Sequence, residues 1–318
     1  MATRSDAGIV LRLSDYSETS QIATLLARES GLVRLIAKGV RRSTSARVAV
    51  GLDLLEHGDL LFAPPARGTG LGTLAEWRQR DSFAGLRRAL ILLHAGLYAA
   101  ELCRVLMEEY DPHPEVYDGL HRLLEDLSRS EPAERFGVAG RVLDFQVILA
   151  VSIGFCPNLR GCVACGRARP PGSAGYMSFT AGGLVCRSCV ARFSDPKRVH
   201  GTVIDRLWRA IGTVTPAESA DQPTEAGPPQ EVAADPGGAE SGTPRASERA
   251  GSDRPAERRE PPELAAVELL AEHLSLTVGR RIEVFDLLRR HWTGGRNARA
   301  VAAAADRAEG AEPAGGVG

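Results

Sequence analysis

Short apolar runs separated by polar, Gly or Pro breaks fill the first eighty or so residues. They lie at residues 7–13, 19–27, 31–37, 52–63 and 71–77. Runs of this length bounded by turn-forming residues predict β-strands, although residues 19–27 fit a helix equally well. Five short strands in so short a segment are typical of a small barrel or sandwich. We therefore predict an N-terminal β-domain.

After Asp81 and Ser82, either of which can cap a helix, apolar residues recur every three or four positions. The predicted helices span residues 82–105, 116–127, 131–153, 203–211, 264–276 and 282–292. Proline lacks an amide donor and restricts the residue before it, so Pro112 and Pro114 separate the first helix from the second. Helices that each carry one apolar stripe bury it most simply by packing on one another.

Composition shifts sharply at residues 215–262. This segment holds nine prolines, and Val232 is its only large aliphatic residue. It cannot bury enough apolar surface to offset its conformational entropy, so we predict a disordered linker. The predicted domains are a barrel at 1–80, a helical region at 81–153 that continues at 196–214 and 263–293, a cysteine module at 154–195, the linker at 215–262 and a mobile tail at 294–318.

The net charge of −1 conceals an uneven distribution. The predicted linker has five arginines against ten acidic residues, so the rest of the chain is positive. Residues 31–51 contain no acidic residue and five basic ones, namely Arg34, Lys38, Arg41, Arg42 and Arg47. Cationic side chains and hydroxyl donors on a barrel loop are what a phosphodiester backbone requires, although a solvated basic loop is an equal alternative. Because few aromatic residues lie nearby, we expect binding through this loop to be electrostatic and sensitive to salt.

Four of the six cysteines form two Cys-x-x-Cys pairs, Cys162 with Cys165 and Cys186 with Cys189. This spacing is typical of a structural zinc site, in which four thiolates leave no open position for water or substrate. We predict one zinc ion per chain. An iron–sulfur cluster uses the same ligands, and metal-free thiols or a redox pair are further alternatives. Cys156 fits better as a small buried apolar residue.

The motifs that would indicate an enzyme are absent. Neither lysine follows a glycine, so there is no Walker A loop, and no His-Glu-x-x-His occurs. The chain also lacks a long charge-free apolar run and an apolar signal-peptide core, so we expect a cytoplasmic protein. In such a compartment, clustered cysteines bind metal more often than they form disulfides.

The order of these features resembles the RecO family of DNA repair and recombination mediators. Three stretches carry the resemblance, and they are GIVLRLSDYSETSQIATLLARESGLVRLIAKGVRRSTS, FQVILAVSIGFCPNLRGCVACG and GGLVCRSC. It covers roughly residues 7–213 and returns weakly at 264–292. The resemblance implies an α+β multidomain protein, with an N-terminal OB-fold β-barrel followed by an α-helical domain that carries a four-cysteine zinc-binding module.

The resemblance also implies a function and partners. Family members bind single- and double-stranded DNA, anneal complementary strands and act with RecR to load RecA onto DNA covered by single-strand-binding protein. They bind the acidic tail of that protein through the helical domain. Lys38, Arg41 and Arg42 match the basic barrel turn of the family, and Cys162, Cys165, Cys186 and Cys189 match its zinc ligands. The position of Cys156 within the Gly-Phe-x-Pro turn and the insertion at 215–262 depart from the family pattern.

Two other classes of function remain open at this point. A zinc-ribbon adaptor would dock on a larger assembly without contacting DNA itself. A metalloenzyme would need an open ligand position, which four thiolates do not leave. The leading hypothesis is a DNA-binding mediator, localised to the cytoplasm and the nucleoid, that acts without catalysis.

Overall fold

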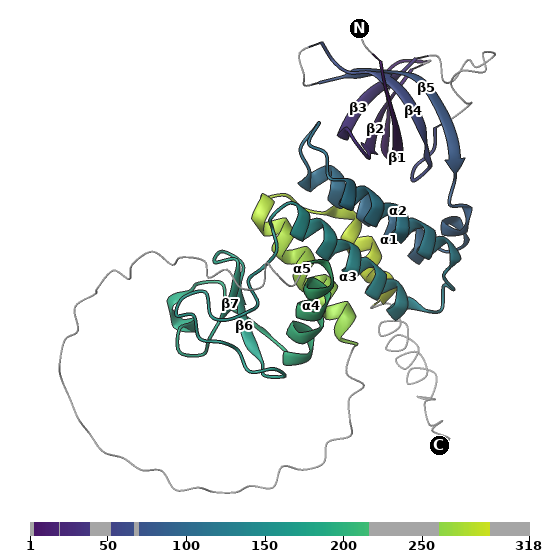
Figure 1. Ribbon diagram of the computed structural model, residues 1–318. Coiled ribbons are helices and arrows are strands. Elements are labelled where there is room, and N and C mark those ends of the chain that lie inside the picture. The colour runs from purple at the N-terminus through teal and green to yellow at the C-terminus, as the bar shows by residue number, and fades with distance from the viewer. Residues whose placement is uncertain (1–2, 19, 39–51, 67–69, 216–260, 293–318) are drawn as a thin grey trace, which may run out of the picture.

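The computed structural model describes residues 3–18, 20–38, 52–66, 70–215 and 261–292. A β-barrel lies at one end of the molecule, helices form the middle, and a small cysteine-containing module lies beyond them (Figure 1). The predicted linker at 215–262 and the tail at 294–318 fall almost entirely outside these residues.

Five strands close the N-terminal barrel in the order β1-β2-β3-β5-β4. Their bounds are Arg4–Asp15 for β1, Gln21–Ala27 for β2, Gly31–Ala37 for β3, His57–Ala63 for β4 and Gly72–Asp81 for β5. All neighbouring pairs are antiparallel except β3 and β5, which are parallel. A five-stranded barrel is the architecture of the OB-fold. The prediction of a barrel is confirmed, and residues 21–27 form a strand and not a helix.

Parts of β1, β2 and β3 are buried on both faces because they border two cores, whereas β4 alternates between buried and half-buried positions and most of β5 is exposed. Val10 and Leu25 lie in the barrel interior with Phe62. Their sequence neighbours Ile9 and Leu26 point to the other side and belong to the core of the helical region. Successive side chains of a strand face opposite ways, so a continuous apolar run fills both cores at once. This arrangement joins the barrel and the helices through a shared apolar interface.

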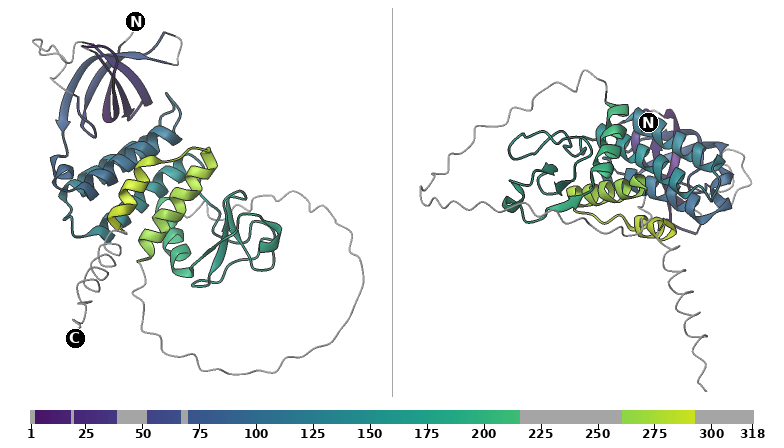
Figure 2. Two further views of the ribbon diagram at one scale, coloured as in Figure 1. Left: turned by 180° about the vertical axis from the view of Figure 1, so that it is seen from behind. Right: turned by 90° about the horizontal axis from the view of Figure 1, so that it is seen from below.

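Five long helices and a shorter helical segment at 283–292 form the middle of the molecule among the residues that the structure describes. They are α1 (Leu90–Leu106), α2 (Pro114–Arg129), α3 (Arg135–Ser152), α4 (Gly201–Val214) and α5 (Pro262–Val278). Figure 2 shows α4 and α5 together on the side toward the cysteine module. Fully buried Gln146 of α3 donates to the Tyr98 hydroxyl of α1 at 2.6 Å and to the Val267 carbonyl of α5 at 3.4 Å. One side chain therefore connects three helices.

The last helical segment is held by a buried carboxylate. Glu101 of α1 accepts hydrogen bonds from the backbone N–H groups of Glu283 and Val284, at 3.1 and 2.8 Å. Those amides begin the segment at 283–292 and have no partner within it. A negative charge at a helix N-terminus also meets the positive end of the helix dipole. Glu101 thereby fixes where this segment docks on α1.

Three details of the predicted elements were wrong. The helix expected at 82–105 is broken, because Ala89 is extended (φ −152°, ψ 142°) between a 3-10 helix at Ala84–Arg88 and α1. The strand expected from residue 52 begins only at His57, because Leu55 takes a left-handed conformation (φ 65°). The helix predicted at 203–211 is longer at both ends.

Polar contacts also join the barrel to α2. Arg28, in the turn between β2 and β3, donates to both carboxylate oxygens of Asp118 at 3.0 Å. Nearby, the Tyr110 backbone N–H donates to the Leu32 carbonyl of β3 at 3.0 Å. This main-chain bond fixes the segment between α1 and α2 against the start of β3.

Replacing Asp118 with asparagine should reduce stability by less than about 1 kcal/mol at neutral pH, because both side chains of the pair are roughly half exposed. The hydrogen bond from Arg28 lowers the pKa of Asp118 below its usual 3.8. A lowered folded-state pKa means that the stabilisation is complete above the unfolded-state pKa and is lost as the pH falls through the lower value. Urea unfolding of both proteins at about pH 7 and about pH 3 checks this. A difference in midpoint that is no smaller at about pH 3 than at about pH 7 would contradict it.

Among the residues placed by the structure, no helix is both long and apolar enough to cross a bilayer.

Candidate metal centre and nucleic-acid interface

The cysteine module is built on a small three-stranded sheet. Its strands are β6 (Gly175–Ser178), β7 (Gly183–Val185) and β8 (Lys197–Val199), in the order β7-β6-β8 with antiparallel neighbours. Strands of three or four residues bury little apolar surface. The core around the thiols consists of Cys162, Val185 and Cys189 with a few half-buried neighbours, while Met177 and Leu184 of the sheet belong to the core of the helical region. Such a module needs a further source of stability.

Two tight turns carry the cysteine pairs. In the first, the Gly166 N–H donates to the Cys162 carbonyl at 2.8 Å, and Gly166 takes a left-handed conformation (φ 70°). In the second, the Cys189 N–H donates to the Cys186 carbonyl at 3.0 Å. The Val163 N–H donates to the Leu184 carbonyl at 2.8 Å and so joins the first turn to β7, which leads into the second. Hydrogen bonding thus brings two pairs that are distant in sequence to one place.

The four thiols form one cluster. The sulfur atoms of Cys162, Cys165, Cys186 and Cys189 all lie within 4.8 Å of one another. Those of Cys165 and Cys186 are 3.8 Å apart. Zinc–sulfur bonds of about 2.3 Å in a tetrahedron place the sulfurs about 3.8 Å apart. The cluster can therefore hold a metal ion, and its spacing fits tetrahedral coordination.

The thiols of Cys162 and Cys189 differ in pKa. Burial acts to raise the pKa of Cys162, but hydrogen bonds from backbone N–H groups, led by that of Cys186, lower it to about 6. Hydrogen bonding to the Cys186 and Cys165 thiols raises the pKa of Cys189 to about 12. Four adjacent sulfurs cannot all ionise without a cation to offset their repulsion. A bound cation would therefore displace the remaining protons, as metal binding to thiols requires.

The module is anchored to the helices on two sides. Arg169 pairs with Asp205 of α4, whose carboxylate also accepts the Gly172 N–H at 2.8 Å. Lys197 of β8 pairs with Glu272 of α5. His273 of α5 lies 3.1 Å, through its Nε2, from the Phe155 carbonyl in the turn that follows α3. These contacts fix the position of the thiol cluster relative to the helical region.

The predicted DNA-binding residues are only partly placed. Lys38 is exposed immediately after β3. Arg34 lies on β3 and points outward, but its guanidinium is 3.5 Å from Glu109, so much of its charge is already balanced. Arg41, Arg42 and Arg47 lie outside the residues that the structure describes. Of the aromatic residues near the barrel, Phe62 and Trp77 are buried, and Tyr16 is exposed.

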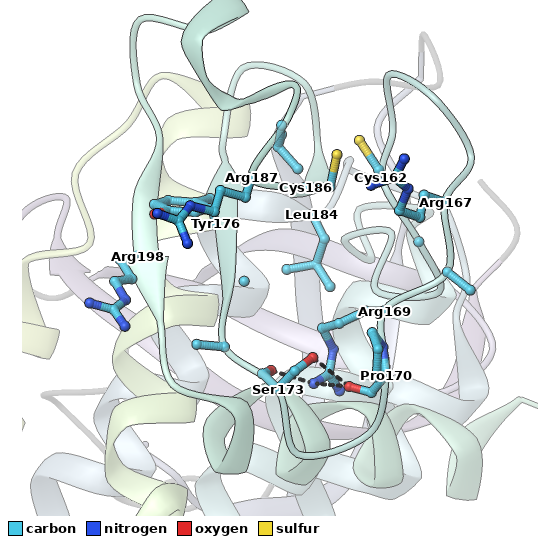
Figure 3. A pocket seen from close by; sticks show the side chains of 15 residues that line it. Cys162, Arg167, Arg169, Pro170, Ser173, Tyr176, Leu184, Cys186, Arg187 and Arg198 are labelled. Carbon is cyan, nitrogen blue, oxygen red and sulfur yellow. Dashed lines mark hydrogen bonds between the residues drawn. The ribbon is translucent and has the colours of Figure 1, made fainter. Parts of the chain in front are cut away.

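Sequence reasoning missed a second group of basic residues, on the cysteine module. Residues 154–200 contain six arginines and one lysine but a single acidic residue, Asp195. Three of these arginines, Arg167, Arg187 and Arg198, line a cavity beside the thiol cluster (Figure 3). The excess of basic over acidic residues in this segment could have indicated the group, although the spacing of the arginines follows no motif.

Comparison with known proteins supports a single family. The model described as "Recombination protein O N terminal" matches residues 1–83, and "Recombination protein O C terminal" matches residues 87–225. The DNA repair protein RecO of Rhodopirellula baltica is 34% identical over 71% of this chain and 78% of its own length. The RecO protein of Bacillus subtilis is 31% identical over 60% of this chain and 70% of its own length.

The barrel and the larger part of the helical region lie within these matches, whereas α5 and the segment at 283–292 lie beyond them. The N-terminal model covers the closed barrel, and the C-terminal model covers α1 to α4 with all four clustered cysteines. The resemblance inferred from three short stretches is thus supported along most of the chain. From its sequence and its fold, the chain belongs to the RecO family of DNA repair proteins.

Proposed function

We propose that this protein binds single- and double-stranded DNA, anneals complementary strands and assists the loading of RecA in recombinational repair. It acts by binding and not by catalysis. Its partners are RecR and the acidic tail of single-strand-binding protein, and it works in the cytoplasm at the nucleoid. The observation that carries the proposal is the closed barrel of a RecO-family chain, from which β3 leads through exposed Lys38 into a segment rich in arginine.

The proposed mechanism is electrostatic. Lys38, Arg41, Arg42 and Arg47 hold phosphate groups, while Arg34 contributes less because Glu109 balances its charge. Neutralised phosphates release counterions and repel one another less, so two complementary strands can approach and pair. Contacts with phosphates carry no sequence information, and we therefore expect binding that is independent of sequence.

The proposed metal is one structural zinc ion held by Cys162, Cys165, Cys186 and Cys189. The cluster geometry and the four-thiol donor set support zinc. When bound, the ion supplies a cross-link between two turns and no reaction chemistry, since four thiolates leave no position for a substrate. The ion thereby stabilises a module whose own apolar core is small.

The double substitution Arg41→Ala/Arg42→Ala tests the barrel turn. We expect about tenfold weaker binding to single strands of any sequence, with a slope of log affinity against log salt that is flatter by about 1.4, because two phosphate contacts are lost. The measurement is fluorescence anisotropy of the full-length protein with labelled oligonucleotides over a range of salt concentrations.

The matched control is Arg135→Ala/Arg290→Ala, which removes the same charge from two exposed positions of the helical region. It should leave both the affinity and the salt slope close to those of the wild type. Equal losses in the two double variants would show that overall charge, and not the barrel turn, governs binding. Absence of binding by the wild type would favour a zinc-ribbon adaptor instead.

A further inference from the structure

A cavity of about 430 Å³ lies in the cysteine module, between the thiol cluster and Arg169. Its volume is within the range of about 300–1,000 Å³ that is typical of small-ligand sites. Cys162 and Cys186 form part of its wall, whereas Cys165 and Cys189 do not line it. A metal ion bound by all four thiols would therefore lie at the edge of the cavity and leave most of it open.

The cavity has a fixed floor. The Arg169 side chain is largely buried and donates to the carbonyls of Pro170 and Ser173 (Figure 3). It also pairs with Asp205. Its charge is thus balanced within the protein. Arg169 therefore shapes the cavity, and its guanidinium is not available to pair with an anionic ligand.

The rim, in contrast, carries three exposed arginines. Arg167, Arg187 and Arg198 form no ion pair with any side chain in the described ranges. In Figure 3, Arg167 lies on the opposite side of the cavity from Arg187 and Arg198. Guanidinium groups are planar, permanently charged donors that suit phosphate oxygens and stack on flat rings. An anion in the cavity would meet positive charge from two sides.

An aromatic and an aliphatic side chain complete the wall. Tyr176 of β6 is directly opposite Arg198 of β8 in the sheet register, so the two side chains lie on the same face of the sheet. Tyr176 is only partly buried. Leu184 pairs with Met177, so its side chain lies on the other face of the sheet, and it lines the cavity between Arg167 and the two arginines on the opposite side (Figure 3). A ligand that has both an anionic group and a flat apolar ring matches this lining, and a nucleotide has both.

We infer that this cavity is a second nucleic-acid site, which takes one nucleotide unit of a single strand. Arg167, Arg187 and Arg198 contact its phosphates, and Tyr176 supports its base. The barrel and the module lie at opposite ends of the helical region (Figures 1 and 2), so this site and the barrel turn hold separate stretches of nucleic acid. The inference rests on the proposed strand binding, but it concerns residues other than those of the barrel turn.

The test places Arg167→Ala/Arg187→Ala/Arg198→Ala in the wild type and in the Arg41→Ala/Arg42→Ala background. In each background the affinity for a labelled dT oligomer should fall about tenfold or more, and the salt slope should flatten by about 2 for three lost phosphate contacts. Tyr176→Leu should weaken binding at least about fivefold by removing the stacking surface. Free dTMP as a competitor distinguishes a site for mononucleotides from one that requires a strand.

Matched controls come from the same module. Arg192 is exposed, has no ion-pair partner among the placed residues and does not line the cavity, so Arg192→Ala should bind like its parent. Tyr176→Phe retains the ring, and the triple Arg→Lys variant retains the charge, so both should restore most of the affinity. Metal content and thermal unfolding show whether each variant is folded.

The outcomes separate the cavity site from the proposed function. If the triple Arg→Ala variant binds like Arg192→Ala while the wild type binds DNA, the cavity site is wrong and the proposed function stands. If the wild type binds no DNA at all, both are wrong. If an acidic peptide displaces the dT oligomer from the barrel-turn variant more effectively than unlabelled dT does, the cavity is a peptide site, and the inference is overturned.

Discussion

Replacing Cys162 with serine should remove the bound metal and unfold the cysteine module. The Cys162 sulfur is buried within the cluster, and serine cannot provide the thiolate that a soft metal prefers. The free energy that zinc supplies to small finger domains is about 10–16 kcal/mol. The core of three buried residues around the thiols cannot replace it in the two cysteine turns, whereas Met177 and Leu184 of the small sheet belong to the core of the helical region.

The expected loss is local to the module. The barrel and the long helices have cores that do not include the thiol cluster. Metal analysis should therefore fall from about one ion per chain to none. Limited proteolysis should cut within residues 160–196, while far-ultraviolet circular dichroism should retain most of the helical signal.

Cys156 provides the control for this experiment. It lies six positions before Cys162 but outside the cluster, and burial raises its pKa to about 11, so it is a poor thiolate. Cys156→Ser should retain the metal and the resistance to proteolysis. A Cys162→Ser protein that keeps one tightly bound ion and an intact module would contradict the structural role assigned to the cluster.

The second large effect is expected for Gly31→Ala, where the barrel meets the helical region. Gly31 has a φ of +71°, and a Cβ atom there would lie 2.3 Å from the Asp111 carbonyl oxygen. The left-handed conformation alone costs alanine about 1–2 kcal/mol. Relief of the overlap would move the Asp111 backbone away from β3 and cost about 1–3 kcal/mol more. The sum of these two effects is a loss of about 3 kcal/mol.

Gly154→Ala separates these two contributions. Gly154 has a similar φ of +76°, but no atom lies within 4 Å of the position that its Cβ would take. It should therefore lose only about 1–2 kcal/mol in chemical denaturation. Equal losses in the two variants would show that the segment at Asp111 does not press on the start of β3 as the structure indicates.

Sequence patterns correctly predicted the elements that are determined by residues close together in the chain. The continuous apolar runs of β1 to β3 and the Cys-x-x-Cys pairs are patterns of neighbouring residues. The structure contains both the barrel and the thiol cluster that these patterns predicted. The break at Ala89 could not be predicted in this way, because the apolar spacing continues from Leu86 through Leu93. Before the break, the Asp81 carboxylate accepts a hydrogen bond from the Phe83 N–H at 2.7 Å. A separate 3-10 helix then begins at Ala84 and ends before Ala89.

The arginine-lined cavity shows the other limit of sequence reasoning. Its rim residues are spread from Arg167 to Arg198, and no fixed spacing relates them. Tyr176 and Arg198 become neighbours only through the register of β6 and β8. Long-range strand pairing therefore creates this site. Only the excess of basic residues between 154 and 200 could have indicated it beforehand.

The decisive experiment for the proposed function is the rate at which the intact protein anneals complementary strands. Two labelled complementary oligonucleotides are mixed, and pairing is followed by energy transfer at moderate salt. We expect that the wild type accelerates pairing, that higher salt suppresses the effect, and that Arg41→Ala/Arg42→Ala removes most of it while Arg135→Ala/Arg290→Ala does not. A wild-type protein that leaves the rate unchanged, or a barrel-turn variant that is as effective as the wild type, would contradict the electrostatic mechanism.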